Sequence, residues 1–139
     1  MITNERQYKI TRKRIEALKV EIGELNEMHL IEQGIDPVVI EAQKRSLQDQ
    51  LAALERQVAR YDELRRGTHR TLLSANIADI GEKLIEARIS RNLSQKELAS
   101  RLDMKEQQIQ RYEQEKYLSA NLVRIASVIE ALKLDFQAR

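Results

Sequence analysis

Apolar residues in the first half of the chain recur at alternating spacings of three and four. This spacing predicts two helices, each with apolar residues along one side. One series is Tyr8, Thr11, Ile15, Leu18, Ile22 and Leu25, and the other is Ile40, Leu47, Leu51, Leu54, Val58 and Tyr61. Between them, Gly34 can end a helix in a left-handed conformation, and Asp36 and Pro37 suit the first turn of the next. Residues 1–67 are predicted to form an antiparallel coiled-coil hairpin with arms of about 35 to 40 Å. Gly23 is its weak point, because glycine inside a helix costs about 1 kcal/mol relative to alanine.

Shorter amphipathic patterns follow in the second half. One helix is predicted from Ser74 to near Asn92, with Ile77, Ile80, Leu84 and Ala87 on its apolar side. Another is predicted to begin at a Ser119 cap and to bury Leu122, Ile125, Ile129 and Leu132. The chain has 33% charged residues, only 4% aromatic residues and a single proline, so helices with solvated faces are favoured over strands. We expect an all-α protein.

Two further helices between residues 94 and 114 are predicted to meet at a steep angle. The apolar residues that fix this geometry are Leu98, Ala99 and Leu102 on the first helix and Ile109 and Tyr112 on the second. Only Asp103 and Met104 remain to form the turn. Ser94 and Glu97 have the S-x-x-E spacing of a capping box, in which each side chain satisfies a free amide at the helix start.

Composition argues against several classes of protein. The chain has no cysteine, so it has neither disulfides nor thiolate metal sites. His29 and His69 have no second histidine nearby in the sequence, so we expect no metal site. The sequence shows no catalytic motif and no phosphate-binding loop, so we expect neither enzymatic activity nor a cofactor. No stretch reaches the roughly 20 apolar residues of a membrane span, and the N-terminus lacks a signal-peptide pattern, which suits a cytoplasmic protein. The net charge of +2 carries little weight.

In order along residues 80–134, the motifs resemble the helix-turn-helix of the lambda repressor and Cro family, also called the xenobiotic-response-element family. The residues that carry the resemblance are Ile80-Gly81-Glu82, Arg88, Leu93-Ser94-Gln95, Leu98-Ala99, Ile109, Arg111-Tyr112-Glu113 and Ile125-Ala126. The resemblance implies that the second motif helix enters the DNA major groove. It also implies an ion pair between Arg88 and Glu113, worth no more than about 1 kcal/mol if exposed.

The resemblance further suggests which residues contact DNA. Gln95, with Lys96 beside it, opens the first motif helix, where the glutamine amide would face a phosphate and set the register. The recognition helix, residues 105–114, would present Lys105, Glu106, Gln107, Gln110 and Arg111. Three residues depart from the family pattern: Asp103 replaces a turn glycine, Lys105 replaces a Ser or Thr cap, and Glu106 brings a carboxylate near phosphates.

These observations predict a hairpin over 1–67, a linker over 68–73 with His69 exposed, and a helix-turn-helix domain over 74–139. The expected protein is a homodimeric, sequence-specific regulator of double-stranded DNA, most simply a repressor. An alternative is an antitoxin-type protein whose hairpin binds and masks a partner protein while the helix-turn-helix autoregulates its operon. A third possibility is a nucleoid protein that binds DNA without sequence choice.

Overall fold

The computed structural model describes residues 1–67, 73–133 and 136–138. The chain divides into two compact units, Met1–Arg60 and Tyr61–Arg139, and the division falls inside helix α3 (Pro37–Arg65). The linker predicted over 68–73 lies outside the described residues except for its last residue, Leu73. The class is confirmed as all-α, with one short strand pair added.

The first arm of unit 1 is broken into two helices, so the prediction of a single long helix there was wrong. Helix α1 spans Glu5–Gly23, and α2 spans Glu27–Glu32. The break follows Gly23, the weak point of the sequence pattern. Asn26 then starts α2, because its side-chain oxygen accepts a hydrogen bond from the backbone N–H of His29 at 3.1 Å. The sequence signal for this cap was present at Asn26 but was hidden by the continuous apolar spacing.

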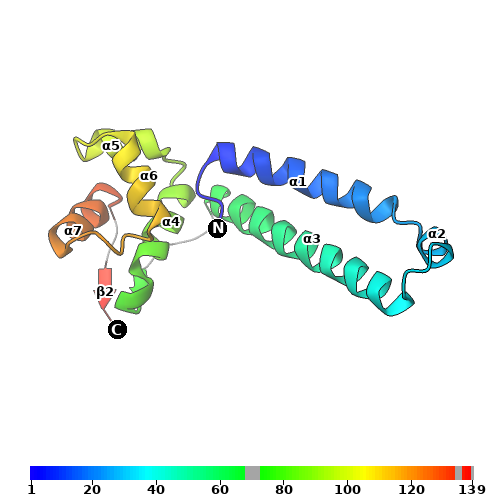
Figure 1. The fold of residues 1–139 in the computed structure, drawn as a ribbon. Helices are drawn as coiled ribbons and strands as arrows, with labels where there is room; N and C mark the ends of the chain where they lie inside the picture. The colour runs from blue at the N-terminus through cyan, green and yellow to red at the C-terminus, as the bar shows by residue number, and fades with distance from the viewer. Residues whose placement is uncertain (68–72, 134–135, 139) are drawn as a thin grey trace. The chain divides into compact units, whose positions relative to one another are not determined.

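Unit 1 is an antiparallel hairpin in which α1 and α2 run beside α3 (Figure 1). Lys19 pairs with Glu55 at 3.9 Å, and Glu27 pairs with Lys44 at 2.7 Å. The residue number increases along the first arm while that of its partner decreases along the second, so the two arms run in opposite directions. The residues of both predicted apolar series are buried or half-buried. At the turn, Gly34 has a φ of +84°.

The predicted start of α3 is also confirmed. Asp36 accepts a hydrogen bond from the backbone N–H of Val38 at 2.9 Å, and Pro37 is the first residue of the helix. At its other end the helix stops at Arg65, and Gly67 adopts a left-handed φ of +68°, a conformation in which glycine commonly follows the end of a helix.

Unit 2 contains helices α4 (Ile80–Ser90), α5 (Gln95–Arg101), α6 (Glu106–Gln114) and α7 (Leu122–Ala131). Before α4 come strand β1 (Leu73–Ala75) and the 3₁₀ turn η1 (Ile77–Asp79), and strand β2 (Phe136–Ala138) follows α7. The strands pair in parallel, with Leu73 opposite Phe136. The prediction of a helix beginning at Ser74 is therefore wrong. The first residues of that predicted helix, up to Asp79, form β1 and the 3₁₀ turn instead. The side chain of Asn76 accepts a hydrogen bond from the backbone N–H of Ala78 in this turn.

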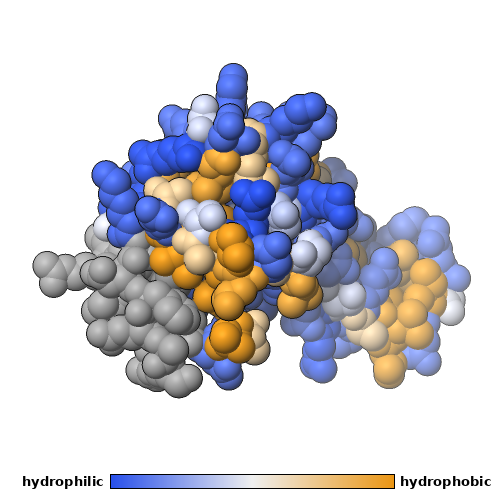
Figure 2. Space-filling view, turned by 90° about the vertical axis from the view of Figure 1, so that its left-hand side faces the viewer, coloured by the Kyte–Doolittle hydropathy of each residue, from blue (hydrophilic) through white to orange (hydrophobic). Residues whose placement is uncertain are grey.

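Helix α7 is capped by Asn121 rather than by the predicted Ser119. The Asn121 side chain accepts a hydrogen bond from the backbone N–H of Arg124 at 2.8 Å. At its far end, Arg91 and Arg101 donate to the carbonyl oxygens of residues 133 and 131. Figure 2 shows hydrophobic surface on the side of unit 2 that carries α5 and α7. The exposed large hydrophobic residues around the start of α7 are Leu118, Leu122 and Val123.

Candidate nucleic-acid interface

The turn between α5 and α6 has the predicted geometry. Asp103 adopts the left-handed conformation with a φ of +52°, so it takes the place of a turn glycine, as its short polar side chain permits. The backbone N–H of Met104 then donates to the carbonyl of Ala99 at 2.9 Å. Ser94 and Glu97 form the predicted capping box, with side-chain to backbone distances of 3.0 and 2.7 Å. The start of the motif and the turn between its two helices are thus fixed by local contacts.

Helix α6 has one buried and one exposed side. Ile109 is fully buried against the rest of unit 2, together with Leu98 and Ala99 of α5. The exposed residues on α6 and at its start include every predicted base or phosphate contact there: Lys105, Glu106, Gln107, Gln110 and Arg111. Lys96 on α5 is exposed as well. The fold therefore brings these six side chains together on solvent-facing surface of the motif.

Neighbouring residues restrain some of these exposed side chains. Gln110 Nε2 lies 3.5 Å from Glu106 Oε1, and Arg111 lies 3.6 Å from the Glu115 carboxylate. Lys105 has no side-chain cap to offer, but its backbone N–H donates to Gln108 Oε1 at 3.0 Å. Gln108 thus does part of the work of the missing Ser or Thr cap, a role that sequence reasoning missed. Glu106 sits in the first turn, where the helix dipole favours an acidic residue.

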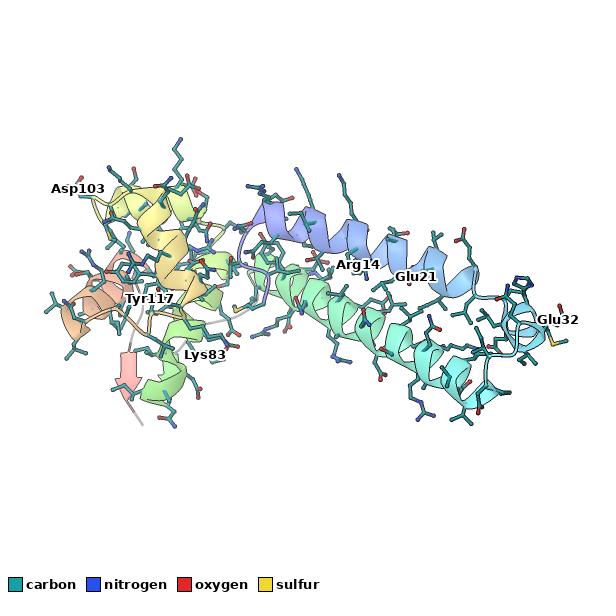
Figure 3. The ribbon with its side chains drawn as sticks, viewed as in Figure 1. Arg14, Glu21, Glu32, Lys83, Asp103 and Tyr117 are labelled. Atoms are coloured by element: carbon teal, nitrogen blue, oxygen red, sulfur yellow. The ribbon has the colours of Figure 1, made fainter. Side chains whose placement is uncertain are left out.

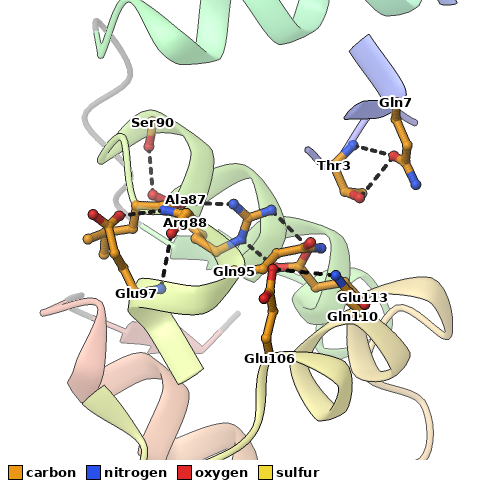
Figure 4. A network of polar contacts seen from close by, with 12 residues as sticks. Thr3, Gln7, Ala87, Arg88, Ser90, Gln95, Glu97, Glu106, Gln110 and Glu113 are labelled. Carbon is orange, nitrogen blue, oxygen red and sulfur yellow. Dashed lines mark hydrogen bonds and ion pairs between the residues drawn. The ribbon is translucent and has the colours of Figure 1, made fainter. Parts of the chain in front are cut away.

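A buried polar network holds α6 against α4 and α5 (Figure 4). The predicted Arg88–Glu113 ion pair is present as a two-pronged contact, in which Arg88 Nε and Nη2 donate to the two oxygens of Glu113, the latter at 2.9 Å. Arg88 Nη1 donates to the carbonyl of Leu93 at 2.8 Å. Because Arg88 is 3% and Glu113 2% exposed, the expectation for an exposed pair does not apply. This pair is buried and fully engaged.

Gln95 takes part in the same network. Its Nε2 donates to Glu113 Oε2 at 2.8 Å, and the residue is only 4% exposed. The expectation that this amide faces a DNA phosphate is therefore corrected: the amide is committed to Glu113 and fixes α5 against α6. Sequence spacing could not anticipate this, because Glu113 lies 18 positions further along the chain.

Comparison with known proteins agrees with this geometry. The model of the helix-turn-helix family matches residues 84–137. The second unit contains a DNA-binding helix-turn-helix domain of the lambda repressor and Cro type. No curated protein and no solved structure matches the chain significantly. The family consists of DNA-binding regulators rather than enzymes.

The helix-turn-helix domain also depends on a close backbone approach at Gly81. A Cβ added there would lie 1.7 Å from the carbonyl oxygen of Lys116. Lys116 and the next residue, Tyr117, both have positive φ, at +51° and +58°. Tyr117 stacks on Tyr112, with ring centroids 5.7 Å apart, and its hydroxyl has no hydrogen-bond partner among the residues that the structure describes. The glycine was visible in the sequence motif, whereas the buried tyrosine was not.

Within residues 1–67, 73–133 and 136–138, His, Asp and Glu side chains nowhere gather in a group of three or more that could hold a metal ion. Of the helices in those ranges, none is long and apolar enough to cross a membrane.

Proposed function

We propose that the chain is a sequence-specific transcriptional regulator, most simply a repressor, that reads the major groove of double-stranded DNA with helix 105–114. One observation carries the proposal: Gln107 and Gln110 are exposed on α6 while Ile109 between them is buried. A helix held in this way offers a polar ridge to a groove that admits an α-helix.

The exposed side chains have different roles in this proposal. Gln107 and Gln110 read bases, because a carboxamide can donate and accept together at adenine N6 and N7. Lys96, Lys105 and Arg111 contact phosphates and position the helix. Glu106 reads cytosine, whose N4 amino group is the donor that a carboxylate can accept from. Gln95 acts indirectly, since its amide holds Glu113 on the same helix.

Selection of sites from random duplex DNA tests the proposal. The wild-type chain should enrich one motif, and Gln107→Ala and Gln110→Ala should each relax one position of it, at about 1 to 3 kcal/mol per lost bidentate contact. Gln43→Ala removes an exposed glutamine from α3 and serves as the matched control. An unchanged motif in both variants would show that the base readers are assigned wrongly.

Salt dependence separates this proposal from sequence-independent binding. Lys105→Ala and Arg111→Ala should weaken binding to all sequences and each lower the salt slope by about one. A steep salt slope without any enriched motif would instead point to a nucleoid-type protein.

The proposed regulator acts as a homodimer in the cytoplasm. Two copies would present two recognition helices to successive major grooves, about 34 Å apart, and bind a nearly palindromic site. Occupying a promoter then blocks transcription. A reporter gene under the selected site should be silenced by the wild-type chain and released by the double variant Gln107→Ala/Gln110→Ala.

An antitoxin-type role is the second candidate. Exposed apolar side chains at the turn of the hairpin favour it, because they suit a partner protein: Met28, Ile31, Val38 and Val39. A toxin-like reading frame beside the gene, whose product protects these residues from hydrogen exchange in a co-purified complex, would support this role. If the chain and the product of that reading frame form no complex when they are expressed together, the antitoxin-type role is excluded.

A further inference from the structure

The hairpin of unit 1 is strongly polarised in charge, although its sum is near zero. The first part of α1 carries more cations than anions: Arg6, Lys9, Arg12, Lys13, Arg14 and Lys19 against Glu5 and Glu16. From residue 21 to residue 41 every side chain that is charged at neutral pH is acidic: Glu21, Glu24, Glu27, Glu32, Asp36 and Glu41. In Figure 3, the labelled Arg14, Glu21 and Glu32 follow this change of sign along the arm.

A second stripe runs along α1 and does not contribute to the hairpin's own seam. Its members recur at spacings of three and four and so share one face: Arg6, Lys9, Lys13, Ala17, Val20 and Glu24. All six are exposed, and Val20 is 57% exposed. The basic end forms an open hollow lined by Arg6, Lys9, Ile10 and Lys13. Among the described residues, no ion pair is formed by Arg6, Lys9, Lys13 or Glu24.

We propose that this stripe is the docking surface for a second copy of the chain, packed antiparallel so that α1 lies on α1. This inference rests on the proposed homodimer and names its surface. An antiparallel pair has one register in which Lys13 faces Glu24 of the second copy and Ala17 faces its Val20. Both matches occur together because Lys13 and Ala17 are four positions apart on one copy, and so are Val20 and Glu24 on the other. The two-fold axis of the dimer then passes between Ala17 and Val20.

The stripe is therefore self-complementary, as the surface of a two-fold dimer must be. The small Ala17 lets the two helices approach closely at the axis, where Val20 loses its exposure to water. Lys13 of each copy meets Glu24 of the other, and the aliphatic stem of the lysine can cover apolar neighbours. A parallel arrangement would bring Lys13 against Lys13 and is disfavoured. The charges thus set the orientation and register more than the affinity.

Charge exchange in the full chain tests the surface. Lys13→Glu and Glu24→Lys should each weaken dimerisation by about tenfold, because each change sets like charges together twice per dimer. The combined variant should recover most of the lost affinity. Sedimentation equilibrium at low salt gives the constants, and Arg45→Glu, an exposed residue of α3 with the same change of charge, should leave them unchanged.

Cross-linking measures independently whether the two α1 helices lie side by side. The chain has no native cysteine, so only the introduced cysteine can react. Val20→Cys should form a covalent dimer with a short thiol-to-thiol reagent at low protein concentration, and Gln48→Cys on α3 should not. Equal cross-linking of the two variants, or a combined charge variant that stays as weak as the single ones, would overturn the proposal.

Other surfaces give different results. If Leu122→Asp/Val123→Asp abolishes the dimer while Lys13→Glu and Glu24→Lys leave it intact, the start of α7 is the interface and the proposal falls. If Lys13→Glu lowers affinity for all DNA sequences without changing the mass, the basic stripe is a DNA surface and the proposal also falls. Failure of site selection with cross-linking intact would refute only the proposed DNA reading.

Discussion

The two units of this protein bury different kinds of side chain. In Met1–Arg60 the buried residues are aliphatic, among them Ile15, Leu18 and Leu47. In the second unit an aliphatic core is joined by buried polar and charged residues: Glu86, Arg88, Ser90, Gln95 and Glu113. A purely apolar seam accepts many side chains of similar volume, whereas hydrogen bonds between buried charges have one geometry.

This difference teaches how each unit is specified. The hairpin needs a regular apolar spacing and local caps, so single changes should cost little there. Unit 2 holds α6 in place through contacts between residues far apart in sequence, such as Arg88 and Glu113, which are separated by 25 positions. Single changes in that network should therefore affect the whole unit, including the face of α6 that we propose reads DNA.

The largest expected effect is the loss of Glu113. Glu113→Ala leaves the buried Arg88 guanidinium and the Gln95 amide without their acceptor, which should destabilise unit 2 by about 3 to 5 kcal/mol. Hydrogen exchange at the amides of α4 and α6 in the full chain measures it. Lys19→Ala, which removes the exposed ion pair with Glu55 in unit 1, should cost less than about 1 kcal/mol and serves as the control.

A paired substitution sharpens the same comparison. Arg88→Met/Glu113→Leu replaces the buried ion pair by apolar side chains and should recover most of the stability lost in Glu113→Ala. If Glu113→Ala costs no more than Lys19→Ala, burial of the network does not distinguish the two units.

Glycine substitutions should separate the units next. Gly81→Ala would drive a Cβ to 1.7 Å from a backbone oxygen and 2.5 Å from the carbonyl carbon of Lys116. Neither atom can move without shifting the backbone, so a loss of about 3 kcal/mol is expected in unit 2. In Gly23→Ala the new Cβ meets nothing within 4 Å, and unit 1 should gain up to about 1 kcal/mol of helix stability. Urea unfolding followed by hydrogen exchange in each unit gives both values, and equal effects would contradict the comparison.

The same contrast explains what could be predicted from sequence. The seam, the caps at Ser94 and Asp36, and the left-handed Asp103 follow from spacing and local chemistry, because each depends on neighbours within a few positions. The Arg88–Glu113 pair was predicted only through resemblance to a family. Its burial could not be predicted, since burial depends on which elements enclose the pair.

Errors arose where the pattern used for the prediction was overridden, either by a competing local signal or by a contact between distant residues. The apolar spacing runs through Gly23, yet the Asn26 cap starts a new helix there. A long amphipathic pattern suggested a helix from Ser74, but the pairing of β1 with β2, which lie over 60 positions apart, takes its first residues. For Gln95, the family pattern suggested a phosphate contact, and only the fold shows that its amide is held by Glu113.

The smallest expected effect concerns Tyr117, whose hydroxyl group is not part of the polar network of unit 2. Burial raises the pKa of this tyrosine, with the nearby Glu113 carboxylate adding to the effect. Above pH 10, the unfolded chain releases the phenolic proton while the folded chain keeps it, so this residue lowers stability as the pH rises through that range. Tyr117→Phe should be neutral or stabilising by up to about 1 kcal/mol at pH 7, because it removes a buried hydroxyl without a partner among the described residues.

The variant should also flatten the fall in stability between pH 9 and 11, on the scale set by the ordinary tyrosine pKa of about 10. Urea unfolding across this range measures it, with Tyr112→Phe, a half-buried neighbour, as the control. A tyrosine in the unfolded chain is the same at either position. A difference in pH dependence between the two variants therefore reports a difference between the two sites in the folded chain. A marked loss of stability in Tyr117→Phe at pH 7 would mean that the hydroxyl is bonded after all. The polar network of unit 2 would then extend past Glu113 into the segment that follows α6.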